Sequence, residues 1–377
     1  MNYLDQSFYH QWAEINDKQL QQQLDEVQTT DVERLLGQPK ITLKDMPVLL
    51  SAAAEKYLEP LAQQSQALTR QRFGHTMGFF VPLYLSNLCA NDCSYCGFSM
   101  SNRIKRLTLT PQQVEAECLA IKALGFDTIL LVTGEHEQKV GMDYFASVLP
   151  IIKQHFSYVM LEVQPLSTQQ YQTLRALGVD SVLVYQECYE QKTYQQHHLK
   201  GNKTDFRWRL ETPDRLGQAG MDKIGVGCLL GLSSWRLDCL KLAMHVDYLQ
   251  KHYWQSRLSV AFPRLRPCTG GIVPEHLPTD GQLLQLIAVF RLFNPQIDIV
   301  LSTREPATLR NNLLGLGVTQ ISAGSKTQPG GYADQTLALA QFEIDDERSP
   351  AQMAEVVKEA GFEVVWKDWE PAYSAKN

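Results

Sequence analysis

GFFVPLYLSNLCANDCSYCGF, residues 78–98, is an apolar run that ends in a loop with three cysteines. The run is apolar throughout rather than at alternate positions, which is typical of a parallel strand buried on both faces. Seven further runs of this kind follow, separated by stretches with helical periodicity. They are TILLVTGE (128–135), YVMLEVQP (158–165), SVLVYQEC (181–188), KIGVGCLLGLS (223–233), RLSVAFPRLRP (257–267), DIVLSTRE (298–305) and TQISAGSKT (319–327).

Eight strand–helix repeats over about 250 residues are the length and period of a (β/α)8 barrel. Gly125, Gly178, Gly220 and Gly317 precede four of the runs, where a helix end favours a left-handed residue. A doubly wound open sheet is the alternative, but it usually has fewer strands and a glycine-rich phosphate-binding turn after the first one. This sequence lacks that turn. We therefore predict an α/β fold of the TIM-barrel type.

The chain divides into three predicted parts. Residues 1–75 are rich in Gln, Leu and Ala at helical spacing, which predicts an N-terminal helical extension. Residues 76–326 form the barrel. Residues 327–377 form a C-terminal lid and closing segment, in which QPGGYAD (328–334) is a flexible stretch across the barrel mouth.

The composition argues against several classes of protein. The formal net charge is −6 and no segment is strongly basic, so we expect no nucleic-acid partner. No run of about 18 apolar residues is present, so we expect no membrane association. Residues 1–17 have no signal-peptide pattern. Eight cysteines without a disulfide-scaffold spacing favour a cytoplasmic location and metal or redox chemistry.

Polar residues follow the predicted strands. In such barrels the catalytic groups lie at the carboxyl ends of the strands, which together form one mouth. The residues at these ends are Thr133, Gly134, Glu135, Glu162, Gln164, Gln186, Glu187, Arg264, Arg266, Thr303, Arg304, Glu305, Ser322, Ser325 and Lys326. A single group of this kind is usually just solvated, whereas the complete ring predicts a functional site.

Cys89, Cys93 and Cys96 have the spacing CxxxCxxC. Thiolates bind soft metals, so a zinc site and an iron–sulfur cluster are the two alternatives. Structural zinc takes four ligands, usually from two Cys or His pairs, and no second pair lies nearby. Cys118 lies on the apolar face of a predicted helix and is assigned to the core. Because a cluster has four ligand positions, three cysteines leave one iron open for a bound molecule.

The CxxxCxxC loop, with Tyr95 between its second and third cysteines, resembles the signature of the radical S-adenosylmethionine enzymes. The resemblance implies a [4Fe-4S] cluster on three cysteines, whose open iron chelates the amino and carboxylate groups of S-adenosylmethionine. Reductive cleavage of that cofactor then yields a 5′-deoxyadenosyl radical, which abstracts hydrogen. Thr133-Gly134-Glu135 is similar to the GGE-like motif that binds the methionine amino group in this superfamily.

Further motifs narrow the resemblance to the tyrosine lyases of thiamine biosynthesis. The likeness spans essentially the whole chain and includes FVPLYLSNLCANDCSYCGF, VYQECY, HHLKGNKTDFRWRLETPDR, SRLSVAFPRLRPCTGG, LSTRE and SKTQPGGYAD. These enzymes cleave the Cα–Cβ bond of L-tyrosine to 2-iminoacetate (dehydroglycine) and p-cresol. The resemblance implies two partners: thiazole synthase, in a heteromeric complex, and an electron donor such as a flavodoxin or a ferredoxin.

The substrate carboxylate has two predicted ligands. Related aromatic amino-acid lyases use an Arg and a Ser at comparable strand ends, which implies these roles for Arg304 and Ser322. A guanidinium suits a carboxylate because it donates two parallel hydrogen bonds. The alternative for Arg304 is an ion pair with Glu305 or another carboxylate of the rim.

The remaining cofactor contacts are predicted from charge and position. Glu162 and Glu187, with the adjacent Gln186, are assigned to the ribose hydroxyls or the sulfonium charge, and ion pairs with arginines of the rim are the alternative. Lys203 and Arg209 are assigned to the methionine carboxylate. The alternative for Arg209 is a partner among its near neighbours Glu211 and Asp214. Adjacent histidines seldom chelate one ion, so His197-His198 is interpreted as a loop that shapes the mouth.

Other functions remain as alternatives. The tyrosine lyase of hydrogenase cofactor assembly carries a second cysteine cluster in a C-terminal extension, whereas no cysteine follows Cys268 here. A lyase acting on tryptophan is the main alternative, because pocket shape is not legible from sequence. A metal-binding regulator would leave the ring of polar groups without a role. A tRNA-modifying enzyme would need a basic groove.

Overall fold

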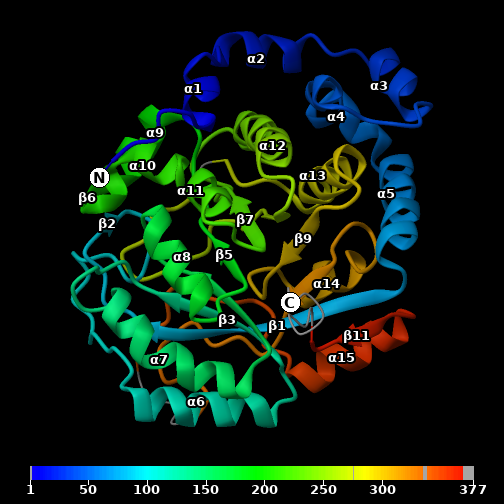
Figure 1. Cartoon of the computed structure of the whole chain (residues 1–377). Coiled ribbons are helices and arrows are strands. Elements are labelled where there is room, and N and C mark those ends of the chain that lie inside the picture. Colours follow the sequence, from blue (N-terminus) through cyan, green and yellow to red (C-terminus); the bar gives the residue numbers. More distant parts are fainter. Residues whose placement is uncertain (1, 275, 334–337, 368–377) are drawn as a thin grey trace.

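The computed structural model describes residues 2–274, 276–333 and 338–367. At its centre is a parallel sheet closed into a barrel (Figure 1). Its strands are β1 (Thr76–Ser86), β3 (Thr128–Thr133), β4 (Tyr158–Glu162), β5 (Ser181–Leu183), β7 (Lys223–Gly227), β8 (Arg257–Ala261), β9 (Asp298–Leu301) and β10 (Gln320–Ser322). The pairing of Phe80 with Ser322 closes β10 onto β1. The eight predicted strands and the barrel are therefore confirmed, and the open sheet is excluded.

Helices follow the strands and cover the outside of the barrel. They are α6 (Pro111–Ala123), α7 (Met142–His155), α8 (Thr168–Ala176), α9 (Gln191–His197), α10 (Phe206–Leu210), α11 (Thr212–Gln218), α12 (Trp235–His252), α13 (Asp280–Phe293) and α14 (Ala307–Asn312). Capping boxes begin three of them, as at Thr110 and Gln113 of α6, because the side chains satisfy the first free amides.

The predicted glycine ends are correct for three helices. Gly125, Gly178 and Gly220 have φ values of 97°, 93° and 71° just after α6, α8 and α11. Gly317 differs from the prediction, although its φ of 141° is also positive. Helix α14 ends at Asn312, and a turn closed by the bridge between Leu314 and Val318 separates it from β10.

N-terminal helices lie over α12 and α13 (Figure 1). They are α1 (Phe8–Ala13), α2 (Asp17–Asp25), α3 (Thr29–Leu36), α4 (Met46–Leu50) and α5 (Leu58–Phe73), with short 3-10 turns at Leu43–Asp45 and Ala53–Tyr57. Buried leucines pack the interface, and Gln285 of α13 donates to the carbonyls of Leu49 and Ser51. This layer lies outside the barrel wall, so it stabilises the barrel without reaching its interior.

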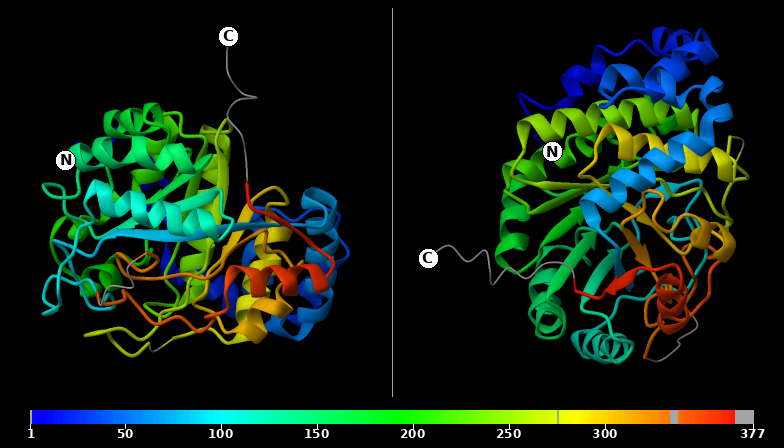
Figure 2. Two further views of the ribbon diagram at one scale, coloured as in Figure 1. Left: turned by 90° about the horizontal axis from the view of Figure 1, so that it is seen from below. Right: turned by 90° about the vertical axis from the view of Figure 1, so that its right-hand side faces the viewer.

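The C-terminal part contains α15 (Pro350–Glu359) and β11 (Glu363–Val365), which pairs with the start of β1 (Figure 2). Before α15, the chain crosses the barrel mouth: Gly97 donates to the Gln341 carbonyl, and Asp345 donates to the carbonyl of Thr303. Within the predicted lid, Tyr332 donates to the carbonyl of Pro82 and to Glu117. Residues 334–337 and 368–377 of that predicted part lie outside the described residues, and the lid remains a prediction.

No helix within the described residues is both long enough and apolar enough to span a lipid bilayer.

Candidate active site

The cysteine loop follows β1 and is held at both ends by one arginine. Arg106 donates to the carbonyls of Asn87, Phe98, Ser99 and Asn102 at 2.8, 2.7, 2.7 and 3.1 Å. A guanidinium has five donors in a fixed plane, so one side chain organises the whole loop. Sequence reasoning missed Arg106, because it stands outside the cysteine motif and not at a strand end.

A second segment, residues 197–203, is bonded to the loop from the other side. Strand β2 (Asp92–Cys93) pairs antiparallel with β6 (His198–Lys200), and the Ser94 amide donates to the carbonyl of His197 at 3.1 Å. The Tyr95 hydroxyl lies 2.7 Å from Nε2 of His198, whose Nδ1 lies 2.6 Å from the Tyr194 carbonyl. His198 therefore contacts the cysteine loop, but it is the first residue of β6 and does not line either cavity, so its predicted role at the mouth remains a prediction.

Cys89, Cys93 and Cys96 line one cavity of about 920 Å3. Their thiols are free, and burial raises the pKa of Cys89 to about 11 and that of Cys93 further. Within the described ranges no three Cys, His, Asp or Glu side chains converge as ligands of one ion. A [4Fe-4S] cluster does not require such convergence, because each cysteine binds a different iron. Three thiols around a single cavity therefore fit this cluster better than they fit zinc.

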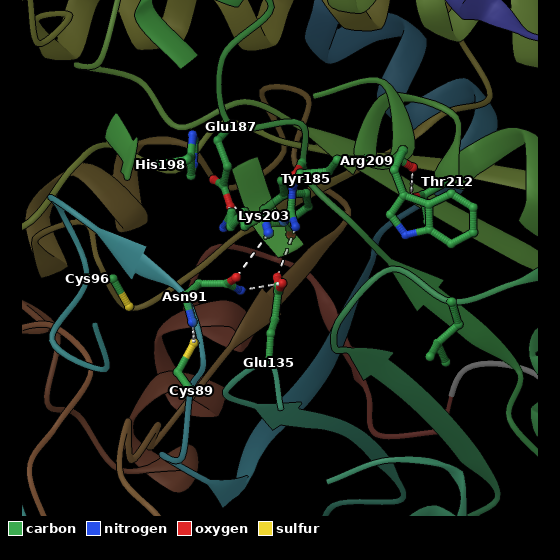
Figure 3. A network of polar contacts seen from close by, with 12 residues as sticks. Cys89, Asn91, Cys96, Glu135, Tyr185, Glu187, His198, Lys203, Arg209 and Thr212 are labelled. Carbon is green, nitrogen blue, oxygen red and sulfur yellow. Dashed lines mark hydrogen bonds and ion pairs between the residues drawn. The ribbon is translucent and has the colours of Figure 1, made fainter. Parts of the chain in front are cut away.

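The Thr133-Gly134-Glu135 segment follows β3 and lies directly against the cysteine loop. A Cβ on Gly134 would approach the Leu88 carbonyl oxygen to 2.3 Å, so only glycine permits this contact. Glu135 accepts from Nδ2 of Asn91 at 2.7 Å, and the Asn91 Oδ1 accepts from the Lys203 amide at 3.0 Å (Figure 3). The buried Thr133 hydroxyl has no partner in the described structure and lines the same cavity. It is available to a bound cofactor.

Arg209 joins Glu135 to Glu187, and Lys203 is a second partner of Glu187 (Figure 3). Arg209 lies 2.9 Å from Glu135 and 3.3 Å from Glu187, and Lys203 lies 2.7 Å from Glu187. Burial acts to raise the pKa of Glu187, but Lys203 and Arg209 leave it lowered. The alternative partners of Arg209 are therefore wrong, since its ion pairs reach across the mouth to β3 and β5 rather than to Glu211 or Asp214.

Glu187 has the only positive φ, 70°, among the described residues other than glycine. This left-handed conformation is unfavourable for a side chain and persists where surrounding contacts impose it. It turns Glu187 into the cysteine cavity. Gln186 does not line either cavity, and the two polar atoms of its buried side-chain amide have no partner in the described structure. Its predicted cofactor contact remains a prediction.

A second cavity of about 930 Å3 occupies the barrel interior and adjoins the first. The two cavities share seven lining residues: Val132, Glu162, Leu183, Tyr185, Pro263, Arg304 and Phe342. A molecule in the barrel interior would therefore meet a molecule bound beside the cysteines across a wall of shared side chains. Tyr185 and Phe342 were missed at the sequence level. Phe342 lies in an irregular segment without periodicity, and aromatic residues at strand ends carry no specific signal.

Arg304 lies at the boundary of the two cavities. Its guanidinium stacks on the Phe342 ring at 3.4 Å, and no ion pair of Arg304 is found in the described parts of the chain. The predicted alternative partner, Glu305, accepts instead from Arg264 Nε at 2.9 Å. That alternative is wrong, and Arg304 is available to an anionic ligand. Ser322 lines the interior cavity, and its hydroxyl accepts from the Thr303 amide at 3.2 Å, which leaves its own proton to donate.

Glu162 ends β4 and lines both cavities. Burial raises the pKa of this carboxyl to about 7, the negative charge of Glu187 adds to the rise, and Arg304 opposes it. Because no hydrogen bond or ion pair of the Glu162 side chain is found among the described residues, the alternative of a pair with an arginine of the rim is not present. It is a carboxyl group that a ligand can engage.

Comparisons with known proteins agree with this geometry. Residues 83–242 match the radical SAM superfamily, and residues 261–363 match the biotin and thiamin synthesis associated domain. The 2-iminoacetate synthases of Salmonella typhimurium and Escherichia coli are each 54% identical over 365 residues, covering 97% of this chain and 97% of each relative. The FeFe-hydrogenase maturase HydG from Carboxydothermus hydrogenoformans superposes with a TM-score of 0.83 at 31% identity, covering 95% of this chain and 82% of that one. With such identity over almost its full length, the chain belongs to the 2-iminoacetate synthase family of the radical SAM superfamily.

Proposed function

We propose that this chain is a carbon–carbon lyase that cleaves the Cα–Cβ bond of L-tyrosine. The products are 2-iminoacetate and p-cresol, together with 5′-deoxyadenosine and methionine, and the iminoacetate supplies the thiazole of thiamine. Family membership supports the reaction. The observation that carries the proposal is the pair of adjoining cavities. One is lined by three free thiols, and the other is lined by Arg304, which makes no ion pair within the described residues.

Cys89, Cys93 and Cys96 would hold the [4Fe-4S] cluster, with one iron left open for S-adenosylmethionine. When bound, the cluster and S-adenosylmethionine supply a hydrogen-abstracting 5′-deoxyadenosyl radical. The polar groups of the cysteine cavity would hold the rest of the cofactor: Tyr95, Thr133, Gly134, Glu135, Glu162, Glu187, Lys203 and Arg209. The ion pairs among Glu135, Glu187, Lys203 and Arg209 would keep these four side chains oriented before the cofactor binds.

Arg304 and Ser322 would hold the carboxylate of tyrosine. A guanidinium and a hydroxyl proton both donate to a carboxylate, and both groups line the interior cavity. The side chain of the substrate then extends into the barrel, where Leu130, Met160 and Val300 form apolar walls. These walls exclude water, which protects a radical from side reactions.

The proposal includes two protein partners. Thiazole synthase would receive the 2-iminoacetate within a heteromeric complex, and a flavodoxin or ferredoxin would supply the electron. All eight cysteines are free thiols, as expected for a chain that works in the reducing cytoplasm.

Anaerobic turnover tests the proposal. The protein is reconstituted with iron and sulfide, its iron content is measured, and reductant, S-adenosylmethionine and tyrosine are added. We expect 5′-deoxyadenosine and p-cresol in similar amounts, and p-cresol only with tyrosine. Deoxyadenosine without p-cresol would retain the radical chemistry but exclude the substrate, and tryptophan would then be tested. Absence of both products from protein loaded with four irons would overturn the proposal.

A further inference from the structure

The interior cavity has a second polar end, opposite Arg304. Its walls are mainly apolar, but Lys223, Ser259 and Gln320 also line it. Lys223 is the first residue of β7, and Gln320 is the first residue of β10, so both belong to the closed end of the barrel. Polar groups at the bottom of an apolar cavity fix the orientation of a ligand.

We call the end of the cavity lined by Lys223, Ser259 and Gln320 its floor. Lys223 contacts two neighbouring polar side chains. Lys223 Nζ lies 2.6 Å from Asp298 Oδ2 and donates to Gln320 Oε1 at 3.2 Å. Ser259 stands opposite Asp298 in the register of β8 and β9. Lys223 is only 1% exposed, whereas the side chain of its partner Asp298 is 13% exposed and lines a different cavity from the interior one.

Ser259 is the floor group that lacks a partner. It is 2% exposed and lines the cavity, and its hydroxyl makes no hydrogen bond within the described parts of the chain. A hydroxyl that opens onto a cavity and has no protein partner can donate to and accept from whatever occupies that cavity. This hydroxyl therefore points to a ligand that brings a hydrogen-bonding group to the floor.

Residues of the two polar ends lie on one face of β10. Gln320 and Ser322 are two residues apart on β10, so their side chains share a face, and the separation along the strand is roughly 6.6 Å. Ser259 is likewise two residues before Ala261, which also lines the cavity. A ligand whose carboxylate lies at Arg304 and Ser322 would place a ring between the apolar walls and a para substituent at the floor.

We propose that Ser259 and Gln320, supported by the pair of Lys223 and Asp298, bind the phenol hydroxyl and select tyrosine over phenylalanine and tryptophan. This inference rests on the proposed function and names the residues that determine its substrate. A phenol both donates and accepts, which the floor matches. A site built to hydrogen-bond a hydroxyl rejects the analogue without it, because the buried polar groups are then left unpaired. Phenylalanine leaves the Ser259 hydroxyl without a hydrogen-bond partner, and the larger indole of tryptophan does not place a hydroxyl there.

Two variants test the floor, Ser259→Ala and Gln320→Leu, with Ser181→Ala as the matched control. Ser181 is a buried serine of β5 whose hydroxyl also lacks a partner in the described structure, but it does not line the cavity. Equilibrium dialysis of tyrosine and phenylalanine against protein loaded with S-adenosylmethionine measures the ratio of the two dissociation constants. We expect Ser259→Ala and Gln320→Leu each to reduce this ratio about tenfold, mainly through weaker tyrosine binding. Ser181→Ala should keep the ratio of the wild type.

Turnover separates this inference from the function on which it rests. In Ser259→Ala we expect KM for tyrosine to rise, while the yield of p-cresol per 5′-deoxyadenosine falls. Wild-type protein that forms p-cresol, together with floor variants that keep the wild-type ratio of dissociation constants, would overturn the floor assignment and leave the function intact. Wild-type protein that forms no p-cresol would overturn both. Gln320→Leu decides the question if Ser259→Ala does not fold.

Discussion

The two cavities that meet at Arg304 are organised in opposite ways. On the cysteine side, Glu135, Arg209, Glu187 and Lys203 satisfy one another through ion pairs. On the barrel side, the side chains of Arg304, Glu162 and Ser259 make no ion pair or hydrogen bond within the described residues, whereas the floor residues Lys223 and Gln320 contact each other. The first arrangement keeps a preformed site in place, and the second leaves side chains free to engage a ligand. This agrees with the proposed preformed site for S-adenosylmethionine beside the proposed site for the amino-acid substrate.

The cysteine side should fail completely when a thiol is removed. Cys93→Ala deletes the most buried of the three proposed ligands, so we expect loss of the cluster and no 5′-deoxyadenosine. Iron and sulfide analysis after reconstitution measures the first effect, and chromatography measures the second. Cys118→Ala is the control, because that cysteine is buried in α6 away from both cavities. Equal iron content in the two variants would contradict the assignment.

A substitution on the barrel side should lower tyrosine cleavage more than it lowers cofactor cleavage. Arg304→Ala removes the proposed carboxylate ligand but no contact of the cysteine loop, so we expect tyrosine turnover to fall roughly 100- to 1,000-fold. Some uncoupled formation of 5′-deoxyadenosine should persist, because the cofactor cavity is otherwise intact. Arg304→Lys keeps the positive charge but lacks the planar pair of donors. Its tyrosine turnover should therefore lie between that of the wild type and that of Arg304→Ala. Equal loss of cofactor cleavage and tyrosine cleavage would show that Arg304 does not act as a substrate ligand.

Features that depend on local sequence could be predicted, whereas contacts between distant segments could not. The eight strands were legible because strands buried on both faces are apolar throughout, and the three cysteines were legible because their spacing is local. The partners of Arg209 were not legible. They depend on α10 folding back across the mouth to meet β3 and β5, which no local pattern records.

Strand alternation also fails where a strand ends. Strand β5 ends at Leu183, and the left-handed φ of Glu187 breaks the alternation beyond it. As a result Glu187 lines the cysteine cavity while Gln186 does not, although the two were predicted together. The floor was missed for a related reason: a lysine at the start of a strand resembles a solvated residue until the barrel closes over it.

Glu162 lines both cavities, and its side chain makes no ion pair within the described residues. The pH dependence of protein stability can therefore test whether this carboxyl is unpaired. Burial raises the pKa of this carboxyl from 4.5 to about 7, so the folded protein holds the proton more tightly than the unfolded chain does. Its contribution to stability is therefore fully present below pH 4.5 and is lost as the pH rises through about 7. The loss is at most about 3 to 4 kcal/mol, for a pKa that rises from 4.5 to about 7.

Urea unfolding of wild type and Glu162→Gln at pH 5 and pH 8 measures this loss. We expect the wild type to lose stability relative to the variant as the pH rises. A difference independent of pH would mean that Glu162 is ionised throughout and paired, like the carboxylates of the cysteine side.

Arg106 provides the smallest and most local test. Its four hydrogen bonds fix both ends of the cysteine loop, so Arg106→Ala should lower the free energy of unfolding by about 2 kcal/mol. It should also slow reconstitution of the cluster, because the three thiols then lose their common orientation. Arg103→Ala is the matched control, since Arg103 is an exposed arginine of the same loop. If both variants take up iron at the wild-type rate, the loop is held by β6 and Glu135 alone, and the preformed character of the cysteine side does not depend on Arg106.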